Sequence, residues 1–198
     1  MKYIAHLKKD KKMGQVMKVT KPYVPKKEKD LYSILLRSIA GQQLSVKAAA
    51  TIWERFLNLF PKKYPEAKLL VKMSDEKLRS AGFSYQKAGY LKNIAAFSMK
   101  NKLDHATLSK MNDAEVIVYL TQIKGVGKWT VEMLLMFALE RPDVFPSGDL
   151  GILNGMKKIY KLTEEGKALR IKCEQIALKW EPYRSHACFY IWPYKDSV

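Results

Sequence analysis

The sequence predicts an all-α protein built as two helical lobes with a cleft between them. Apolar residues recur at three- and four-residue spacing in roughly nine segments, most of which begin with a Ser, Asp or Asn cap. No segment shows a convincing alternation of apolar and polar residues, which a half-buried strand requires. Helices with one apolar face must pack against other helices, and ligand sites in such folds lie between the packed elements.

The expected helices follow in chain order from their caps and stops. Asp30 caps a helix that ends at Gly41, and Ser45 caps a second helix that Pro61 ends. Asn112 and Glu115 form a capping-box pattern before VIVYLTQI. Two further helices are expected at 75–82 after Ser74 and at 85–99 after Ser84. Two more are expected at 128–139 and at 150–160, the second with Asp149 as its N-cap. The last two extend from Thr163 to about Trp180 and onward from Pro182, which suits a first helical turn.

The charge of the chain points to a polyanionic partner. Lysine and arginine number 36 against 19 acidic residues, a formal net charge of +17, and neutralised phosphates release counterions. Apolar residues make up 47% of the chain, which excludes a disordered polypeptide. No apolar run reaches the roughly 18 residues of a spanning helix, and the lysine-rich start lacks a signal peptide's apolar core. We therefore expect an intracellular protein that binds nucleic acid and no membrane.

The domain organisation is predicted from composition. Residues 1–29 are rich in lysine and contain Pro22 and Pro25, so we interpret them as a basic, partly extended arm, with a solvated tail as the alternative. Residues 30–198 form the folded domain. Its inner lobe is expected at about 45–120, and its outer lobe comprises 30–44 and 121–198.

Cysteine usage limits the cofactors. Only Cys173 and Cys188 occur, too few for a disulfide framework, a zinc ribbon or the four thiolates of an iron–sulfur cluster. We expect both thiols to be reduced and buried.

A glycine hairpin between two helices is the strongest local pattern. Gly125 and Gly127 flank Val126 directly before an apolar helix. Glycines allow a tight turn with outward N–H groups, and a helix N-terminus attracts anions, so the pattern predicts a phosphate grip. Lys128 and Thr130 add possible donors. An ordinary corner between two helices is the alternative interpretation.

Four segments together carry a family resemblance. They are the hairpin at 120–131, the loop RPDVFPSGD at 141–149, IAGQQLSVKAAATIW at 39–53 and WEPYRSHACFYIW at 180–192. In this order they resemble the helix-hairpin-helix DNA glycosylase superfamily, and within it the alkylpurine branch of 3-methyladenine DNA glycosylase II type. The resemblance covers about residues 30–192. It implies the glycosylase fold, with the cleft between the lobes binding DNA.

The resemblance implies that Asp149 is the catalytic residue. Cleavage of an N-glycosidic bond leaves positive charge on the sugar, and a fixed carboxylate stabilises that charge and helps to orient or deprotonate water. A helix N-cap position favours the anion. On residue chemistry alone, Asp149 could be only a capping residue, and Asp143 is the competing acid, interpreted as a loop residue.

The same resemblance assigns the base pocket. Lyase-active relatives carry a Schiff-base lysine where this chain has Trp129, so we expect a monofunctional enzyme without lyase activity. Trp129 and Trp192 are expected to line the base pocket with Met133 and Leu150, which replace aromatic residues of the bacterial relatives. The alternative for both tryptophans is an ordinary core position.

The resemblance also implies a wedge and a cation site. Gln43, with Leu44 as its neighbour, matches the residue inserted into the DNA stack, although a helix stop with a buried Leu44 is the alternative. The carbonyls of Thr121, Ile123 and Val126 match a monovalent cation site, and no other cofactor is required.

The resulting hypothesis is a monomeric glycosylase that removes alkylated purines, such as 3-methyladenine and 7-methylguanine, from double-stranded DNA by base flipping. It leaves an abasic site in base excision repair. Two alternatives remain open: a glycosylase for oxidised or deaminated bases, and a DNA-binding protein without catalysis.

Overall fold

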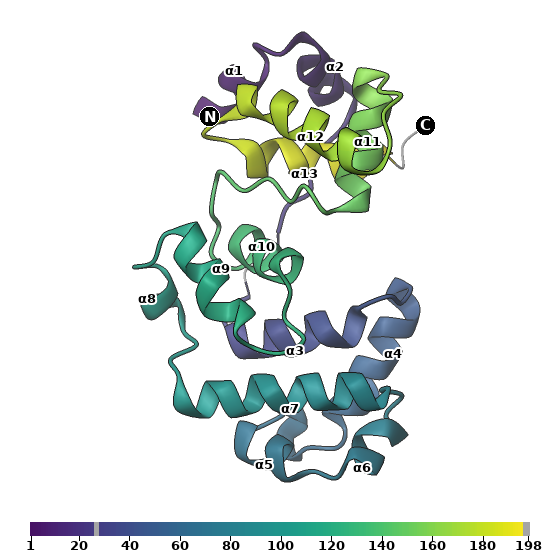
Figure 1. Ribbon diagram of the computed structural model, residues 1–198, viewed down its shortest axis with the longest axis vertical. Helices are drawn as coiled ribbons and strands as arrows, with labels where there is room; N and C mark the ends of the chain where they lie inside the picture. The colour runs from purple at the N-terminus through teal and green to yellow at the C-terminus, as the bar shows by residue number, and fades with distance from the viewer. Residues whose placement is uncertain (26–27, 196–198) are drawn as a thin grey trace. The chain divides into compact units, whose positions relative to one another are not determined.

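The computed structural model describes residues 1–25 and 28–195, and every regular element in this part of the chain is helical (Figure 1). The all-α class is therefore confirmed. Contacts divide the chain into two compact units, which are described separately below. Unit 1 comprises Met1–Lys27 and Leu135–Val198, and unit 2 comprises Glu28–Leu134. None of the helices described is long and apolar enough to cross a membrane.

Unit 2 is organised around its longest helix, α7, which packs against α3 on one side and against α5 and α6 on the other (Figure 1). Side chains from these helices form its fully buried core, among them Leu35, Ile39, Leu70, Leu78, Leu91 and Ile94. The elements of the unit are α3 (Leu31–Gly41), α4 (Val46–Leu57), the 3-10 helix η1 (Pro61–Lys63), α5 (Ala67–Lys72), α6 (Asp75–Ser80), α7 (Tyr85–Lys100), α8 (His105–Leu108), α9 (Asp113–Thr121) and the start of α10 (Lys128–Phe137).

Unit 1 is organised around α13, which packs against α11 and α2. The approach of α11 to α13 is close, because a Cβ atom added to Gly155 would lie 2.4 Å from Cγ2 of Ile191. The elements of the unit are α1 (Lys2–Leu7), α2 (Lys11–Val19), the end of α10, α11 (Leu150–Tyr160), α12 (Gly166–Ala177), the 3-10 helix η2 (Leu178–Trp180) and α13 (Arg184–Lys195).

The predicted helix caps are largely confirmed. Asn112 and Glu115 form a complete capping box at the start of α9, with each side chain accepting the other residue's backbone N–H. The other predicted caps whose side chains accept a backbone N–H in the first turn are Asp30, Ser45, Ser74, Ser84 and Asp149.

The N-terminal segment corrects the sequence analysis. Instead of a basic, partly extended arm or a solvated tail, the chain forms α1 and α2 between residues 2 and 19, and Leu7, Met13 and Val16 are buried in unit 1. Asp10 caps α2 by accepting the N–H groups of Lys12 and Met13. The many lysines had concealed this apolar spacing. The predicted lobe boundary differs as well, because α3 packs with α4 and α7 in unit 2 instead of belonging with the C-terminal helices.

Smaller differences concern helix ends and short helices. Thr163 does not cap α12, which begins at Gly166 after Glu165 and has no side-chain capping hydrogen bond. Pro182 lies before the last helix, which begins at Arg184. Helices α5 and α8 were not predicted, because segments of six and four residues are too short to show helical periodicity.

Candidate functional site

The hairpin connects α9 to α10 within unit 2. The N–H of Val126 donates to the carbonyl of Ile123 at 2.9 Å, which closes the turn, and both side chains are buried. Ile123 and Val126 therefore anchor the turn in the core of unit 2. The buried anchors leave the backbone between them at the surface.

Glycine occupies the two hairpin positions for different physical reasons. Gly125 has a φ of +106°, and a Cβ atom there would lie 2.2 Å from Cγ of Tyr90, so neither the conformation nor the space permits a side chain. Gly127 is exposed, and a Cβ atom added to it would meet no atom within 4 Å. Its backbone is therefore open to a ligand from outside the protein.

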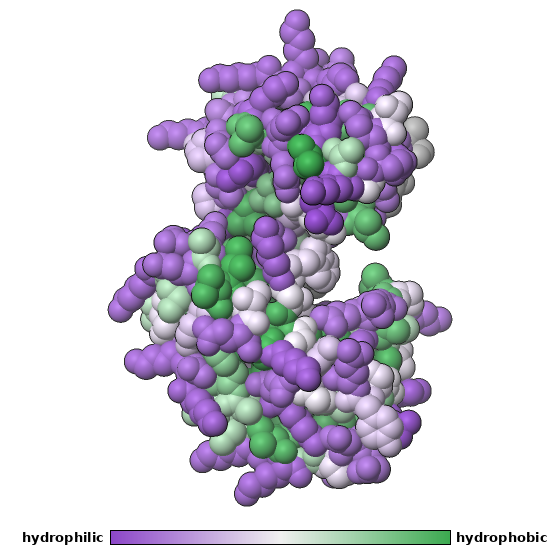
Figure 2. All heavy atoms as spheres, viewed as in Figure 1, coloured by the Kyte–Doolittle hydropathy of each residue, from purple (hydrophilic) through white to green (hydrophobic). Residues whose placement is uncertain are grey.

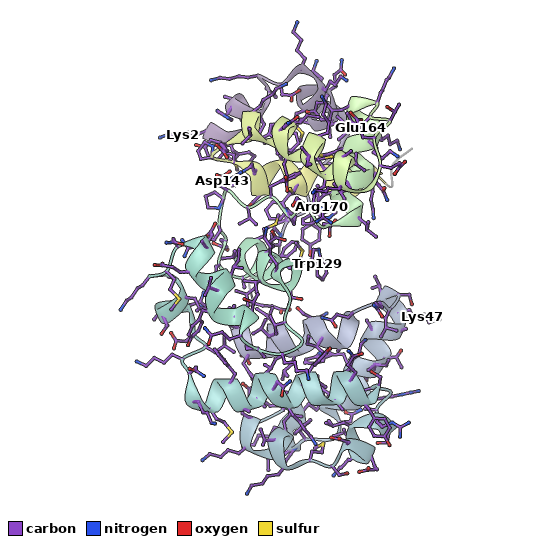
Figure 3. The ribbon with its side chains drawn as sticks, viewed as in Figure 1. Lys2, Lys47, Trp129, Asp143, Glu164 and Arg170 are labelled. Atoms are coloured by element: carbon purple, nitrogen blue, oxygen red, sulfur yellow. The ribbon has the colours of Figure 1, made fainter. Side chains whose placement is uncertain are left out.

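The first turn of α10 presents side chains of different kinds. Lys128 is exposed, and its ammonium lies 3.5 Å from the buried Glu132 carboxylate. Trp129 is 43% exposed and projects outward from α10 (Figure 3). Thr130 is only 3% exposed, so little of its side chain is accessible to a phosphate.

The turn between α3 and α4 holds the predicted wedge residues at the surface. Gln43 has a φ of +57°, a left-handed conformation that is uncommon for a residue other than glycine. Leu44 is 39% exposed, so the alternative of a buried Leu44 is wrong. The ammonium of Lys87 donates to the carbonyls of Ala40 at 3.3 Å and Gln42 at 2.7 Å.

A cavity of about 1020 Å³ joins these features within unit 2. Its walls come from the α3–α4 turn, from α7, and from the hairpin with the start of α10. Concave sites of several hundred Å³ with a few placed polar groups are typical ligand sites. The predicted residues that line it are Gln43, Leu44, Gly125, Val126, Gly127, Trp129, Thr130 and Met133.

Asp149 in unit 1 is the N-cap of α11. Its Oδ1 atom accepts the N–H of Ile152 at 2.9 Å and the indole N–H of Trp192, also at 2.9 Å. Two donors on one oxygen fix the orientation of the carboxylate. The half-buried carboxylate is thus oriented by groups from two helices.

Trp192 is held in turn by its neighbours. Its ring stacks on Phe137, with ring centroids 5.5 Å apart. A Cβ atom on Gly151 would lie 3.0 Å from Oδ1 of Asp149 and 3.1 Å from Cδ1 of Trp192. Glycine at position 151 therefore leaves the space in which this hydrogen bond forms.

The loop that carries Asp149 is fastened to the start of α13. Asp143 accepts the N–H and Nε of Arg184 at 3.1 and 2.8 Å, and its second oxygen accepts Nη2 at 2.9 Å. The buried hydroxyl of Ser185 accepts the N–H of Val144 at 2.8 Å. Asp143 thus makes a structural ion pair in the loop, which favours Asp149 as the reactive acid.

The predicted site residues fall into two groups. Unit 2 places the hairpin, the Gln43 turn, Trp129 and Met133 around one cavity. Unit 1 joins Asp149 to Trp192, and Leu150 beside Asp149 is 74% exposed. Sequence reasoning missed the residues that support these groups, which are Lys87, Tyr90, Gly151, Arg184 and Ser185. Each acts through a contact distant in sequence or through backbone space, and neither leaves a local pattern.

Comparisons with known proteins show the family of this chain. Residues 36–181 match the family model of the HhH-GPD superfamily base excision DNA repair protein. The chain is 35% identical to DNA-3-methyladenine glycosylase 1 of Schizosaccharomyces pombe, over 92% of this chain and 82% of the relative.

Two solved structures are similar over almost the whole chain. The first is 3-methyladenine DNA glycosylase of Schizosaccharomyces pombe in complex with abasic DNA, with a TM-score of 0.87, 33% identity, and coverage of 97% of this chain and 95% of that one. The second is a DNA-3-methyladenine glycosidase of Bacillus halodurans, with a TM-score of 0.83, 33% identity, and coverage of 97% and 88%.

Proposed function

Because the chain belongs to the HhH-GPD superfamily of base excision DNA repair proteins, we propose that it is a monofunctional DNA glycosylase for alkylated purines. It hydrolyses the N-glycosidic bond of bases such as 3-methyladenine and 7-methylguanine in double-stranded DNA and leaves an abasic site. The names of the similar proteins support this choice of substrate and product. The structural observation that carries the proposal is the oriented carboxylate of Asp149.

Asp149 acts on the sugar in this proposal. Departure of the base leaves an oxocarbenium-like sugar, whose charge an already oriented carboxylate stabilises without reorganisation. The same carboxylate positions the attacking water or accepts its proton. The indole N–H of Trp192 and the N–H of Ile152 hold the carboxylate in place throughout. A purine alkylated at N3 or N7 carries positive charge and leaves readily, so no general acid is needed.

The hairpin holds the DNA backbone. The open backbone at Gly127 lies at the N-terminal end of α10, where the helix dipole favours a phosphate, and Lys128 adds a positive charge beside it. Hydrophilic residues cover most of the visible face of each unit, and the net charge of +17 favours a duplex of any sequence (Figure 2). This binding carries no sequence information, as suits an enzyme that searches for damage.

The wedge and the base pocket use the unit 2 cavity. Gln43 fills the space that the flipped nucleotide leaves, with Leu44 beside it. The exposed ring of Trp129 stacks on the cationic base, an attraction worth roughly 0.5–2 kcal/mol. Met133 contributes a polarisable thioether to the same wall. Trp192 and Leu150, the other two residues predicted for the pocket, lie in unit 1 beside Asp149.

The chemistry is hydrolysis without strand cleavage. A Schiff base with the sugar requires an amine, and the resemblance places the lysine of lyase-active relatives at the position that Trp129 occupies here. Lys128 lies one residue earlier in α10, and its ammonium is near the Glu132 carboxylate. Borohydride should therefore trap no covalent complex between this protein and an abasic duplex, and a trapped complex would contradict this part of the proposal.

A monovalent cation at the hairpin is a subsidiary proposal. The carbonyls of Thr121, Ile123 and Val126 are neutral oxygen donors in one turn, which suits a monovalent ion better than a divalent one. The Ile123 carbonyl accepts one hydrogen bond, from Val126, and a carbonyl oxygen has a second lone pair for an ion. Titration with potassium at constant ionic strength should strengthen DNA binding. An unchanged affinity would contradict the proposed cation site.

Base release from methylated duplex DNA tests the proposed function. The wild type should release methylated purines, and Asp149→Asn should lower the single-turnover rate by roughly a hundredfold or more with DNA binding retained. Asparagine caps a helix as well as aspartate, so α11 stays intact. Asp104→Asn makes the same exchange at the N-cap of α8 and should release bases at the wild-type rate. A wild type that binds but releases no base would overturn the function, and an unchanged rate in Asp149→Asn would overturn the assigned role.

A further inference from the structure

Helix α7 supports both DNA-facing turns of unit 2. Lys87, Tyr90 and Asn93 recur at three-residue spacing and therefore lie on one side of the helix. Lys87 donates to the α3–α4 turn. Tyr90 and Asn93 contact the hairpin. These two turns are far apart in the sequence, and a single rigid helix sets the distance between them.

The contacts of α7 with the hairpin are direct. The ring of Tyr90 lies against Gly125, where no Cβ atom could fit. Asn93 donates from its amide to the carbonyl of Lys124 at 3.0 Å. Gln42 adds a link from the other turn, because its amide donates to the carbonyl of Gly125 at 3.5 Å.

Lys87 is placed at the strained part of the α3–α4 turn. The carbonyls of Ala40 and Gln42, which accept from its ammonium, lie at the C-terminal end of α3, where the helix dipole is negative. Gln43 follows directly with its left-handed φ of +57°. A backbone in this region persists only where its surroundings restrain it.

The ammonium is directed into the protein. Lys87 is half-buried, and burial lowers the pKa of its ammonium. The carbonyls of Ala40 and Gln42 accept hydrogen bonds that water would accept from a lysine at the surface. Its side chain is thus committed to the turn rather than extended toward a phosphate. This geometry separates Lys87 from exposed lysines such as Lys128.

We propose that Lys87 is a positioning residue, which holds Gln43 in the conformation that enters the DNA stack and keeps this turn in register with the phosphate-binding hairpin. The proposal rests on the proposed glycosylase function, since it concerns the flipping step of that reaction. Lys87 does not bind DNA itself in this role. It acts through the carbonyls of Ala40 and Gln42.

The variant Lys87→Met keeps an unbranched side chain that is one atom shorter and removes the ammonium donors. Base flipping, followed by the fluorescence of 2-aminopurine beside a methylated purine, should slow by roughly tenfold to a hundredfold together with single-turnover base release. Affinity for undamaged duplex should change less than about twofold. The slope of log affinity against log salt should stay as in the wild type, whereas loss of a direct phosphate contact would reduce it by about one.

Two further variants make the test specific. Lys100→Met removes an exposed lysine from the last position of the same helix and should leave flipping and release unchanged. Lys87→Arg restores a cationic donor and should recover most of the flipping rate. If Lys87→Met does not fold, Lys87→Gln takes its place, because glutamine retains a neutral donor and should give an intermediate flipping rate.

The outcomes separate this inference from the proposed function. A wild-type flipping rate in Lys87→Met, or a salt slope reduced by about one, would overturn the positioning role while base release by the wild type still stands. A wild type that releases no base would overturn the glycosylase function instead. In that case a flipping signal that Lys87→Met abolishes would still support the role of Lys87.

Discussion

Trp192 donates its indole N–H to Oδ1 of Asp149 at 2.9 Å, and this bond joins the C-terminal helix to the N-cap of α11. The resemblance places Trp192 in the wall of the base pocket. The structure shows a second contribution, because this hydrogen bond fixes the orientation of the Asp149 carboxylate, the proposed catalytic group. Trp192 also stacks on Phe137, so packing within unit 1 restrains the indole ring that holds the carboxylate.

Replacing Trp192 with phenylalanine separates these two roles. Trp192→Phe keeps an aromatic ring against Phe137 and removes the N–H donor. A hydrogen bond to a charged group contributes about 1.5–3 kcal/mol, so we expect base release to slow by roughly tenfold to a hundredfold in single turnover. Duplex affinity should change little. Trp53→Phe, in α4 against Phe56, is the matched control. An unchanged rate in Trp192→Phe would show that the bond does not orient Asp149.

Gly151 is predicted to set the geometry of the same pair. Alanine at this position would place a Cβ atom 3.0 Å from Oδ1 of Asp149 and 3.1 Å from Trp192, so one partner must move by a few tenths of an ångström. We expect Gly151→Ala to fold and to release bases more slowly, by roughly threefold to thirtyfold. Gly148→Ala, where a Cβ atom meets nothing within 4 Å, should keep the wild-type rate. Equal rates in the two variants would contradict the steric argument.

Local interactions were predictable from the sequence, and contacts between distant segments were not. The caps at Asp30, Ser45 and Asp149 each involve a residue three positions later, so a short pattern reveals them. The hairpin was predictable because its glycines and buried anchors lie in one short stretch.

The supporting contacts have no such signature. Lys87 and Ala40 are 47 residues apart, and nothing near either residue in the sequence indicates that they meet. The need for glycine at 151 arises partly from the Trp192 side chain on another helix, 41 residues away. Residues 1–29 were interpreted as an arm because lysines dominate their composition, although three apolar positions there are buried.

Cys173 predicts a pH dependence of stability. Burial, followed by the charges of Glu164 and Glu174, raises the pKa of this thiol from 9.0 to about 11. Between these values the unfolded state loses a proton that the folded state retains, so this group lowers the free energy of unfolding as pH rises from about 9 to about 11. Urea unfolding at pH 8, 9 and 10 should show a steeper decline for the wild type than for Cys173→Ala. Parallel curves would exclude the thiol as the titrating group.

The two hairpin glycines should respond differently to alanine. Gly125→Ala combines a φ of +106° with a Cβ atom only 2.2 Å from Cγ of Tyr90, and overpacking of this kind costs about 1–3 kcal/mol before the backbone strain is added. Its Tm should fall by several degrees or more.

The variant Gly127→Ala should instead affect DNA binding. A Cβ atom there meets no protein atom within 4 Å, so the Tm should stay within about two degrees of the wild type. Duplex affinity should fall, because the added methyl group would lie where the phosphate is proposed to bind. Thermal unfolding and fluorescence anisotropy on one duplex measure both effects. Wild-type affinity in a folded Gly127→Ala would place the phosphate elsewhere, and an unchanged Tm in Gly125→Ala would mean that Tyr90 can move aside.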